Sequence, residues 1–137
     1  MHDKNQIANV FFDLDHTLWD FEKNSALTFE KIFDQLKIDV NLNVFLEAYD
    51  GINHHYWKLY RENKISQKEL RHKRLIKTFE AIDFAFDPQK IELISDQYVL
   101  HLSTFSNLFE GAISLLDGLK IKYQLHVITN GFEIVQH

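Results

Sequence analysis

Cysteine is absent from this chain of 137 residues, which also has only one proline and four glycines. The absence of cysteine excludes disulfide bonds, thiolate metal sites and cysteine nucleophiles, and it agrees with a reducing, cytoplasmic setting. Because glycine and proline mark tight turns, their scarcity favours long regular elements and a helix-rich architecture. No stretch approaches the roughly 20 apolar residues that span a bilayer as a helix. We therefore expect a cytoplasmic protein that does not enter a membrane.

The chain also has no excess of positive charge. Its formal net charge is −5 with histidine neutral, so attraction of the whole molecule to nucleic acid or to anionic lipid is not expected. The basic run "RHKR", Arg71 to Arg74, predicts a solvated helix face rather than a binding patch. Hydrophobic residues make up 45% of the sequence and include 12 phenylalanines, which supplies the material for a core.

Hydrophobic periodicity predicts helices between two strands. The apolar run at 7–14 is typical of a strand covered on both faces, as in a parallel sheet. Apolar residues then recur at helical spacing in four longer segments and one short one, before an apolar strand that ends in a Thr-Asn-Gly turn. The expected helices cover 21–36, 43–63, a segment from Ser66, a segment from Pro88 to 105, and 110–120, and the second strand covers 123–131. This order indicates an α/β fold with a large helical insertion after the first strand.

Capping residues predict where these helices begin. Asn24 or Ser25 is the expected N-cap of the first helix. Ser66 is followed three residues later by Glu69, which forms the pattern of a capping box. Asp87 precedes Pro88, and a proline at the first helical position is favourable.

Two aspartates end the first apolar run, in "VFFDLDHTLWD" at 10–20. Side chains at positions i and i+2 of a strand share a face, so Asp13 and Asp15 are expected to lie together. Their repulsion favours one ionised and one protonated carboxyl group, which suits Asp13 as nucleophile or metal ligand and Asp15 as proton donor. A hard cation such as Mg²⁺ would offset their charge. The alternative is that both are loop residues at the start of a helix.

The second strand end strengthens the functional interpretation. Thr129, Asn130 and Gly131 follow the apolar run "HVI", at the carboxyl end of a strand, where open α/β sheets bind ligands. A threonine hydroxyl and the next backbone N–H can hold a phosphate group. Together with Asp13, Asp15 and Thr17, these residues form a candidate site.

These two segments resemble the first two motifs of the haloacid dehalogenase-like (HAD) hydrolase superfamily. "FFDLDHTLWD" is similar to the first motif, a hydrophobic run followed by D-x-D-x-T, and "VITNG" is similar to the second. The resemblance implies a partial Rossmann-like core of parallel strands at 1–17 and 105–137, with a helical C1-type cap at 18–104. Dehalogenases lack an acid at the position of Asp15, so the resemblance favours a phosphatase. His16 and "LWDFEKN" look like the bacterial pyrimidine 5′-nucleotidase branch.

The resemblance also implies a role for each site residue. Asp13 would be the nucleophile that forms an aspartyl-phosphate, and Asp15 would be the general acid and then the base. Both would contribute to the Mg²⁺ site, Asp15 through its backbone carbonyl. Thr129, followed by Asn130 and Gly131, would bind the phosphoryl group of a small phosphate monoester, and Thr17 would steady the loop.

The superfamily's third and fourth motifs have no counterpart in this sequence. We therefore expect a truncated chain with weak affinity for Mg²⁺ and low or no turnover, which covers its incomplete core against another copy. Two alternatives to a nucleotidase remain. One is a sugar-phosphate or phosphoglycolate phosphatase, and the other is a non-catalytic helical module for oligomerisation or binding.

Overall fold

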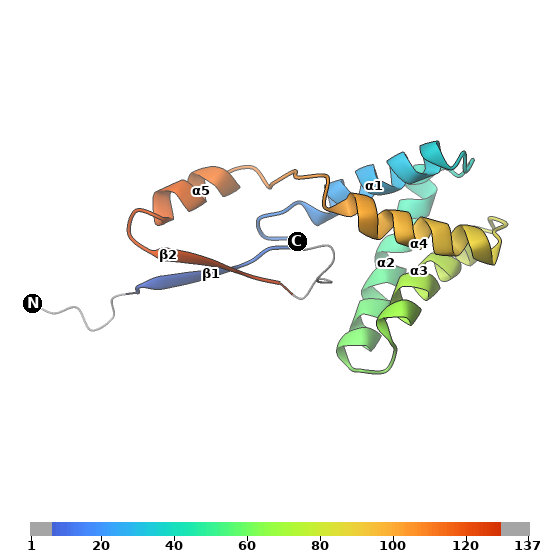
Figure 1. Cartoon of the computed structure of the whole chain (residues 1–137), viewed down its shortest axis with the longest axis horizontal. Helices are drawn as coiled ribbons and strands as arrows, with labels where there is room; N and C mark the ends of the chain where they lie inside the picture. The colour runs from blue at the N-terminus through green and yellow to red at the C-terminus, as the bar shows by residue number, and fades with distance from the viewer. Residues whose placement is uncertain (1–6, 130–137) are drawn as a thin grey trace, which may run out of the picture.

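The computed structural model describes residues 7–129 of the chain (Figure 1). A strand at each end of this range encloses a run of helices, and this order confirms the α/β fold with a helical insertion. The elements are β1 (Asn9–Asp13), α1 (Phe21–Gln35), α2 (Leu42–Arg61), α3 (Gln67–Ala81), α4 (Pro88–Leu102), α5 (Ala112–Leu119) and β2 (Gln124–Ile128). Each helix within 7–129 is too short or too polar to cross a membrane.

The two strands pair in parallel, as the sequence predicts. Asn9 lies opposite Gln124 and Asp13 lies opposite Ile128, so the carboxyl ends of both strands meet at the same edge. The prediction that β1 is covered on both faces is wrong for the described residues, because Phe11 is 59% exposed. Phe11 stacks on His126 of β2, with ring centroids 4.6 Å apart, and otherwise this face of the sheet is largely open.

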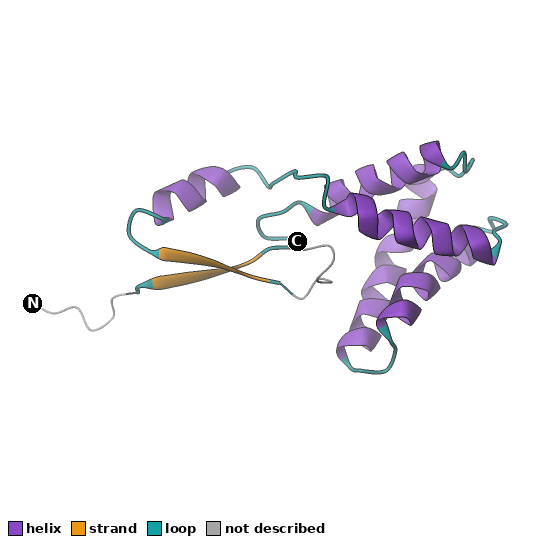
Figure 2. Ribbon diagram, viewed as in Figure 1, coloured by secondary structure: helices purple, strands orange, loops and turns teal. Residues whose placement is uncertain are grey.

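The hydrophobic core lies among the first four helices. In Figure 2 the helices α1 to α4 pack together on one side of the molecule, whereas the sheet and α5 lie on the other. Aromatic rings dominate this core, and their edge-to-face and stacked contacts add to the free energy gained by burial. Phe29 is fully buried and its ring centroid lies 4.8 Å from the rings of Phe45, Tyr49 and Tyr98.

Two of the three predicted helix starts are confirmed. Ser66 and Glu69 form the capping box of α3, and Asp87 with Pro88 begins α4. The prediction for α1 is wrong, because its N-cap is Asp20, whose carboxylate accepts a hydrogen bond from the Lys23 amide at 3.2 Å. The helix therefore begins before Asn24, which is buried within its first turns.

Two connecting segments, 14–20 and 105–109, join the strands to the helices and pair with each other. Trp19 forms an antiparallel bridge with Leu108. The Asp20 amide donates to the Asn107 carbonyl at 2.9 Å, and the Phe109 amide donates to the Leu18 carbonyl at 2.9 Å. The boundaries predicted between core and cap, after residues 17 and 104, fall at or beside these paired segments and stay a prediction.

Candidate functional site

Asp13 is the last residue of β1 and lies at the edge where both strands end. Its partner in the parallel register is Ile128, and Thr129 follows directly in the chain. The Leu14 amide donates to the Ile128 carbonyl at 3.2 Å, which keeps the two segments together for one residue beyond β1. The Asp13 side chain is exposed.

A tight loop after β1 carries Asp15 back toward the helices. The Leu14 carbonyl accepts hydrogen bonds from the amides of Leu18 and Trp19, at 3.1 and 2.9 Å, and the His16 amide donates to the Trp19 carbonyl. His16 has a φ of 66°, a left-handed conformation that glycine adopts without strain. The loop thus folds on itself and places Asp15 beside Trp19.

Asp15 is half-buried, and its carboxyl group differs from an ordinary one. Burial raises the pKa of Asp15, the neighbouring His16 opposes this rise, and the charge on Asp13 adds to it. A raised carboxyl pKa keeps more of the protonated form available at a given pH. Asp15 is therefore the carboxyl group of this loop that is better suited to donate a proton.

The structure describes two of the other predicted site residues, Thr17 and Thr129. Thr129 is half-buried at the end of β2, and Thr17 is exposed at the outer part of the loop. Asn130 and Gly131 lie outside the described residues. The interaction of Thr129 with Asp13 and the roles of all these residues stay predictions.

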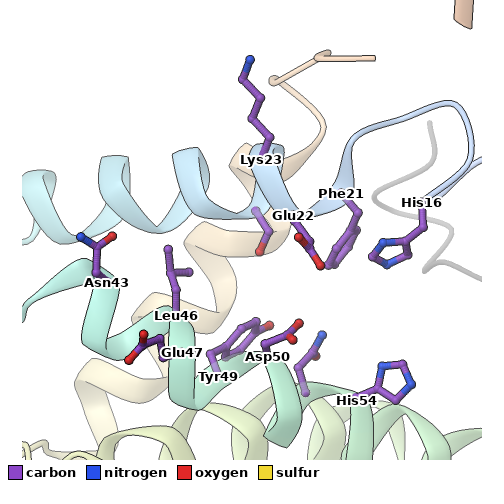
Figure 3. Close-up of a pocket in the computed structure, with 12 residues that line it drawn as sticks. His16, Phe21, Glu22, Lys23, Asn43, Leu46, Glu47, Tyr49, Asp50 and His54 are labelled. Atoms are coloured by element: carbon purple, nitrogen blue, oxygen red, sulfur yellow. The ribbon is translucent and has the colours of Figure 1, made fainter. Parts of the chain in front are cut away.

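A pocket of about 740 Å³ opens beside this loop, between α1 and α2 (Figure 3). His16 forms its border on the side of the loop and contacts Phe21, with ring centroids 5.0 Å apart. Figure 3 shows Tyr49 and Asp50 of α2 on the opposite wall from Glu22 of α1. Residues on both helices and the loop line it: His16, Phe21, Glu22, Lys23, Ser25, Asn43, Leu46, Glu47, Tyr49, Asp50, Asn53 and His54.

Sequence reasoning missed the polar cluster behind this pocket. The prediction of a solvated basic face is wrong for Arg74, which is only 4% exposed. Its guanidinium lies 5.1 Å from the ring centroid of Tyr98 and donates to Asn53 Oδ1 at 3.0 Å. Ser25 and Tyr98 share a buried hydrogen bond of 2.9 Å. The helical spacing of Tyr49 and Asn53 on α2 was the signal in the sequence that these two side chains share a face.

Asn24 was an expected N-cap, and the structure gives it a different role. Its side chain is completely buried, donates to the Asn107 carbonyl and accepts from the Asn107 backbone and side-chain amides at 2.8–3.0 Å. No group of three or more histidine, aspartate or glutamate side chains within residues 7–129 is arranged to hold a metal ion. Asp13 and Asp15 as metal ligands stay a prediction.

Comparison with known proteins gives relatives that share this organisation. YfnB of Bacillus subtilis, which is named as a HAD-hydrolase, is 26% identical to this chain over 128 residues. The match covers 93% of this chain and 53% of YfnB. The pyrimidine 5′-nucleotidase YjjG of Escherichia coli is 25% identical, and the pyrimidine 5′-nucleotidase PynA of Streptococcus pneumoniae is 27% identical. Both matches cover 93% of this chain.

In sequence and in fold, the chain is similar to HAD hydrolases. It spans about half the length of the curated relatives it matches, and no family model matches it. Its fold is that of a crystal structure of YfnB bound to magnesium, with a TM-score of 0.81 at 24% identity, covering 96% of this chain and 56% of that one. The crystal structure of a defluorinating L-2-haloacid dehalogenase, Rha0230, has a similar fold over 92% of this chain, with a TM-score of 0.69 at 13% identity.

Proposed function

We propose that this chain carries the nucleophile and the helical cap of a Mg²⁺-dependent phosphatase that acts on nucleoside 5′-monophosphates. The observation that carries the proposal is the position of Asp13 and Asp15 at the edge where two parallel strands end, with the pKa of Asp15 raised by burial. Edges of this kind are where open α/β sheets bind their ligands. Helices α1 to α4, at 18–104, are the proposed cap over this edge.

In the proposed reaction Asp13 is the nucleophile, and Asp15 is first the general acid and then the general base. A carboxylate oxygen of Asp13 attacks phosphorus, and the bond from phosphorus to the ester oxygen breaks. The protonated Asp15 gives its proton to the leaving alkoxide, and Asp13 is left as an aspartyl-phosphate. Asp15, now ionised, then takes a proton from the water that attacks phosphorus. The bond from phosphorus to the Asp13 oxygen breaks, inorganic phosphate leaves, and both side chains return to their starting states.

The residues present fit a magnesium ion. Mg²⁺ prefers oxygen ligands and keeps several waters, and the exposed Asp13 carboxylate and the Asp15 carbonyl are oxygen donors two residues apart in the chain. Bound there, the ion would neutralise the repulsion between Asp13 and the substrate's phosphate. With these two donors alone, affinity is expected to be weak, because the remaining positions would be filled by water.

Two observations support a nucleotide as substrate. Two of the relatives at similar identity are pyrimidine 5′-nucleotidases by name. The pocket of about 740 Å³ beside the loop is large enough for the nucleoside part of the ester. Its aromatic residues Phe21 and Tyr49 offer flat surfaces against which a base can pack.

A test that does not depend on turnover uses beryllium fluoride, which mimics the phosphoryl group on an aspartate. We expect the chain with Mg²⁺ to give a bound ¹⁹F resonance, and Asp13→Asn to abolish it because the carboxylate that binds beryllium is gone. Asp15→Asn should keep the resonance, since the nucleophile remains. A bound resonance of equal intensity in Asp13→Asn would contradict the assignment of the nucleophile.

Release of phosphate from uridine 5′-monophosphate is the second readout. We expect low turnover from the 137-residue chain. Relative to the unchanged chain, Asp15→Asn should lower kcat by about 10²-fold or more, which is typical for loss of a general acid. Full activity of Asp15→Asn would contradict the proposed proton donor.

A further inference from the structure

Arg74 is a buried cation that pairs with no carboxylate among residues 7–129. It lies on α3, is 4% exposed, and each ion pair of the described residues is formed by other side chains. Removing a charge from water is costly unless other groups take the place of water. Here the centroids of the Tyr49 and Tyr98 rings lie 5.9 and 5.1 Å from the guanidinium carbon, and Asn53 Oδ1 accepts a hydrogen bond from the guanidinium group.

This hydrogen bond determines how the amide of Asn53 is oriented. A guanidinium group has only donors, so Asn53 must turn its oxygen toward Arg74, and the distance from Nη1 to Oδ1 is 3.0 Å. The amide nitrogen of Asn53 then lies on the other side of the group. Because Asn53 also lines the pocket between α1 and α2, the polar atom that it can offer to a ligand there is a donor.

The other polar groups on this wall differ from Asn53. Tyr49, one helical turn before Asn53, lines the pocket, but its hydroxyl is completely buried, with Tyr98 beside it. The exposed carboxylates of Glu47 and Asp50 on the same helix are acceptors. Asn53, backed by the positive charge of Arg74, therefore contributes a hydrogen-bond donor to this wall.

We propose that Arg74 is a positioning residue that fixes Asn53 as a hydrogen-bond donor, so that the pocket selects a carbonyl oxygen over an amino group on the leaving part of the substrate. The inference rests on the proposed nucleotidase function. For a pyrimidine base, it means that uracil, which has an oxo group at C4, binds better than cytosine, which has an amino group there. The amino group of cytosine and the side-chain amide of Asn53 are both hydrogen-bond donors, so they cannot form a hydrogen bond with each other in this orientation.

The test uses nucleosides, because they lack the phosphate and do not need Asp13. Uridine and cytidine are titrated into the 137-residue chain, and binding is followed by NMR through the backbone amides of α1 and α2, a readout that every variant retains. We expect uridine to bind about fivefold more tightly, the difference that one well-placed hydrogen bond makes. Equal affinities, or no binding of either nucleoside, would overturn the inference.

Asn53→Asp is the decisive variant because it keeps the size of the side chain and reverses its chemistry. One carboxylate oxygen still accepts from Arg74, while the other presents an acceptor to the pocket, so the preference should change to cytidine. An unchanged preference for uridine in Asn53→Asp would also overturn the inference. The binding of beryllium fluoride at Asp13 is unaffected by this change, so failure here is distinguishable from failure of the proposed phosphatase site.

Variants at Arg74 separate positioning from a purely structural role. Arg74→Lys keeps a side chain that can only donate and should retain the preference for uridine. Arg74→Met leaves the Asn53 amide free to turn over, and the ratio of the two affinities should fall toward one. A folded Arg74→Met protein with the full preference of the original chain would contradict the positioning role.

Discussion

Asp15 is the residue whose surroundings most change its acid–base behaviour in the proposed site. Burial favours the neutral carboxylic acid, and so does the negative charge of Asp13, although His16 opposes both. The folded chain therefore holds a proton on Asp15 at pH values where the unfolded chain has released it. Stability that is present below the unfolded pKa is lost as the pH rises through the raised folded pKa.

Because the pKa of Asp15 is raised in the folded chain, we predict that Asp15→Asn increases the free energy of unfolding near pH 7. This increase should be smaller near pH 4, where more of Asp15 is already protonated. The asparagine avoids the cost of placing a charge in a half-buried site. The gain should be below about 1 kcal/mol, because solvent screens a group that is only half-buried. Urea unfolding at both pH values measures it, with Asp39→Asn, an exposed position, as the matched control. A gain of equal size at both pH values would contradict the prediction.

The contact between the two connecting segments is where strands and helices are held to each other. Asn24 at the start of α1 and Asn107 after α4 are 83 residues apart in the chain and form three mutual hydrogen bonds of 2.8–3.0 Å. Trp19 adds a fourth link through its indole nitrogen, which donates to the Phe105 carbonyl at 3.1 Å. These bonds fix where the helices sit relative to the loop that carries Asp13 and Asp15.

Asn24→Ala should therefore destabilise the fold by about 1 to 3 kcal/mol, because it leaves the backbone and side-chain amides of the half-buried Asn107 without their common acceptor. Urea unfolding gives the free energy, and hydrogen exchange at the Asp20 amide, which donates to the Asn107 carbonyl, should become faster. Asn43→Ala, at an exposed position on α2, serves as control and should change stability by less than about 0.5 kcal/mol. Equal losses in both variants would refute the role of this contact.

Burial is unevenly distributed over the molecule. The core lies among α1 to α4, whereas the strands, α5 and the residues next to them carry most of the strongly exposed apolar side chains of the described residues. These are Ile7, Phe11, Ile113, Leu115, Ile121, Val127 and Ile128, each at least 50% exposed. A two-stranded sheet is marginal by itself, and an apolar patch of this kind marks a surface that another polypeptide covers.

We propose that a second copy of the chain covers this surface. Sedimentation velocity should then show association that increases with protein concentration, and Val127→Lys on β2 should weaken it by adding a charge to the patch. Leu100→Lys is the matched control, since Leu100 is 62% exposed on α4, away from the strands. A chain that stays monomeric at all concentrations would contradict the proposal, as would equal effects of the two substitutions.

Features that depend on neighbours in the chain could be predicted from the sequence. The capping box at Ser66 and the Asp87–Pro88 helix start involve residues at most three positions apart. The parallel pairing of the strands follows from the order of strand, helices and strand, because a crossover of helices returns the chain in the same direction. The aspartates of "DLD" could likewise be placed at a strand end, since an apolar run leads into them.

Features that depend on residues far apart in the chain could not be predicted in this way. Asn24 looked like a helix cap because its type suits one, but its partner Asn107 comes from beyond α4. Arg74 belongs to a basic run whose other members are partly or fully exposed, and only the packing of α3 against the tyrosines of α2 and α4 buries it. Local pattern fixes which groups the chain offers, whereas three-dimensional packing sets their solvation and partners, and so their pKa and their hydrogen-bonding direction.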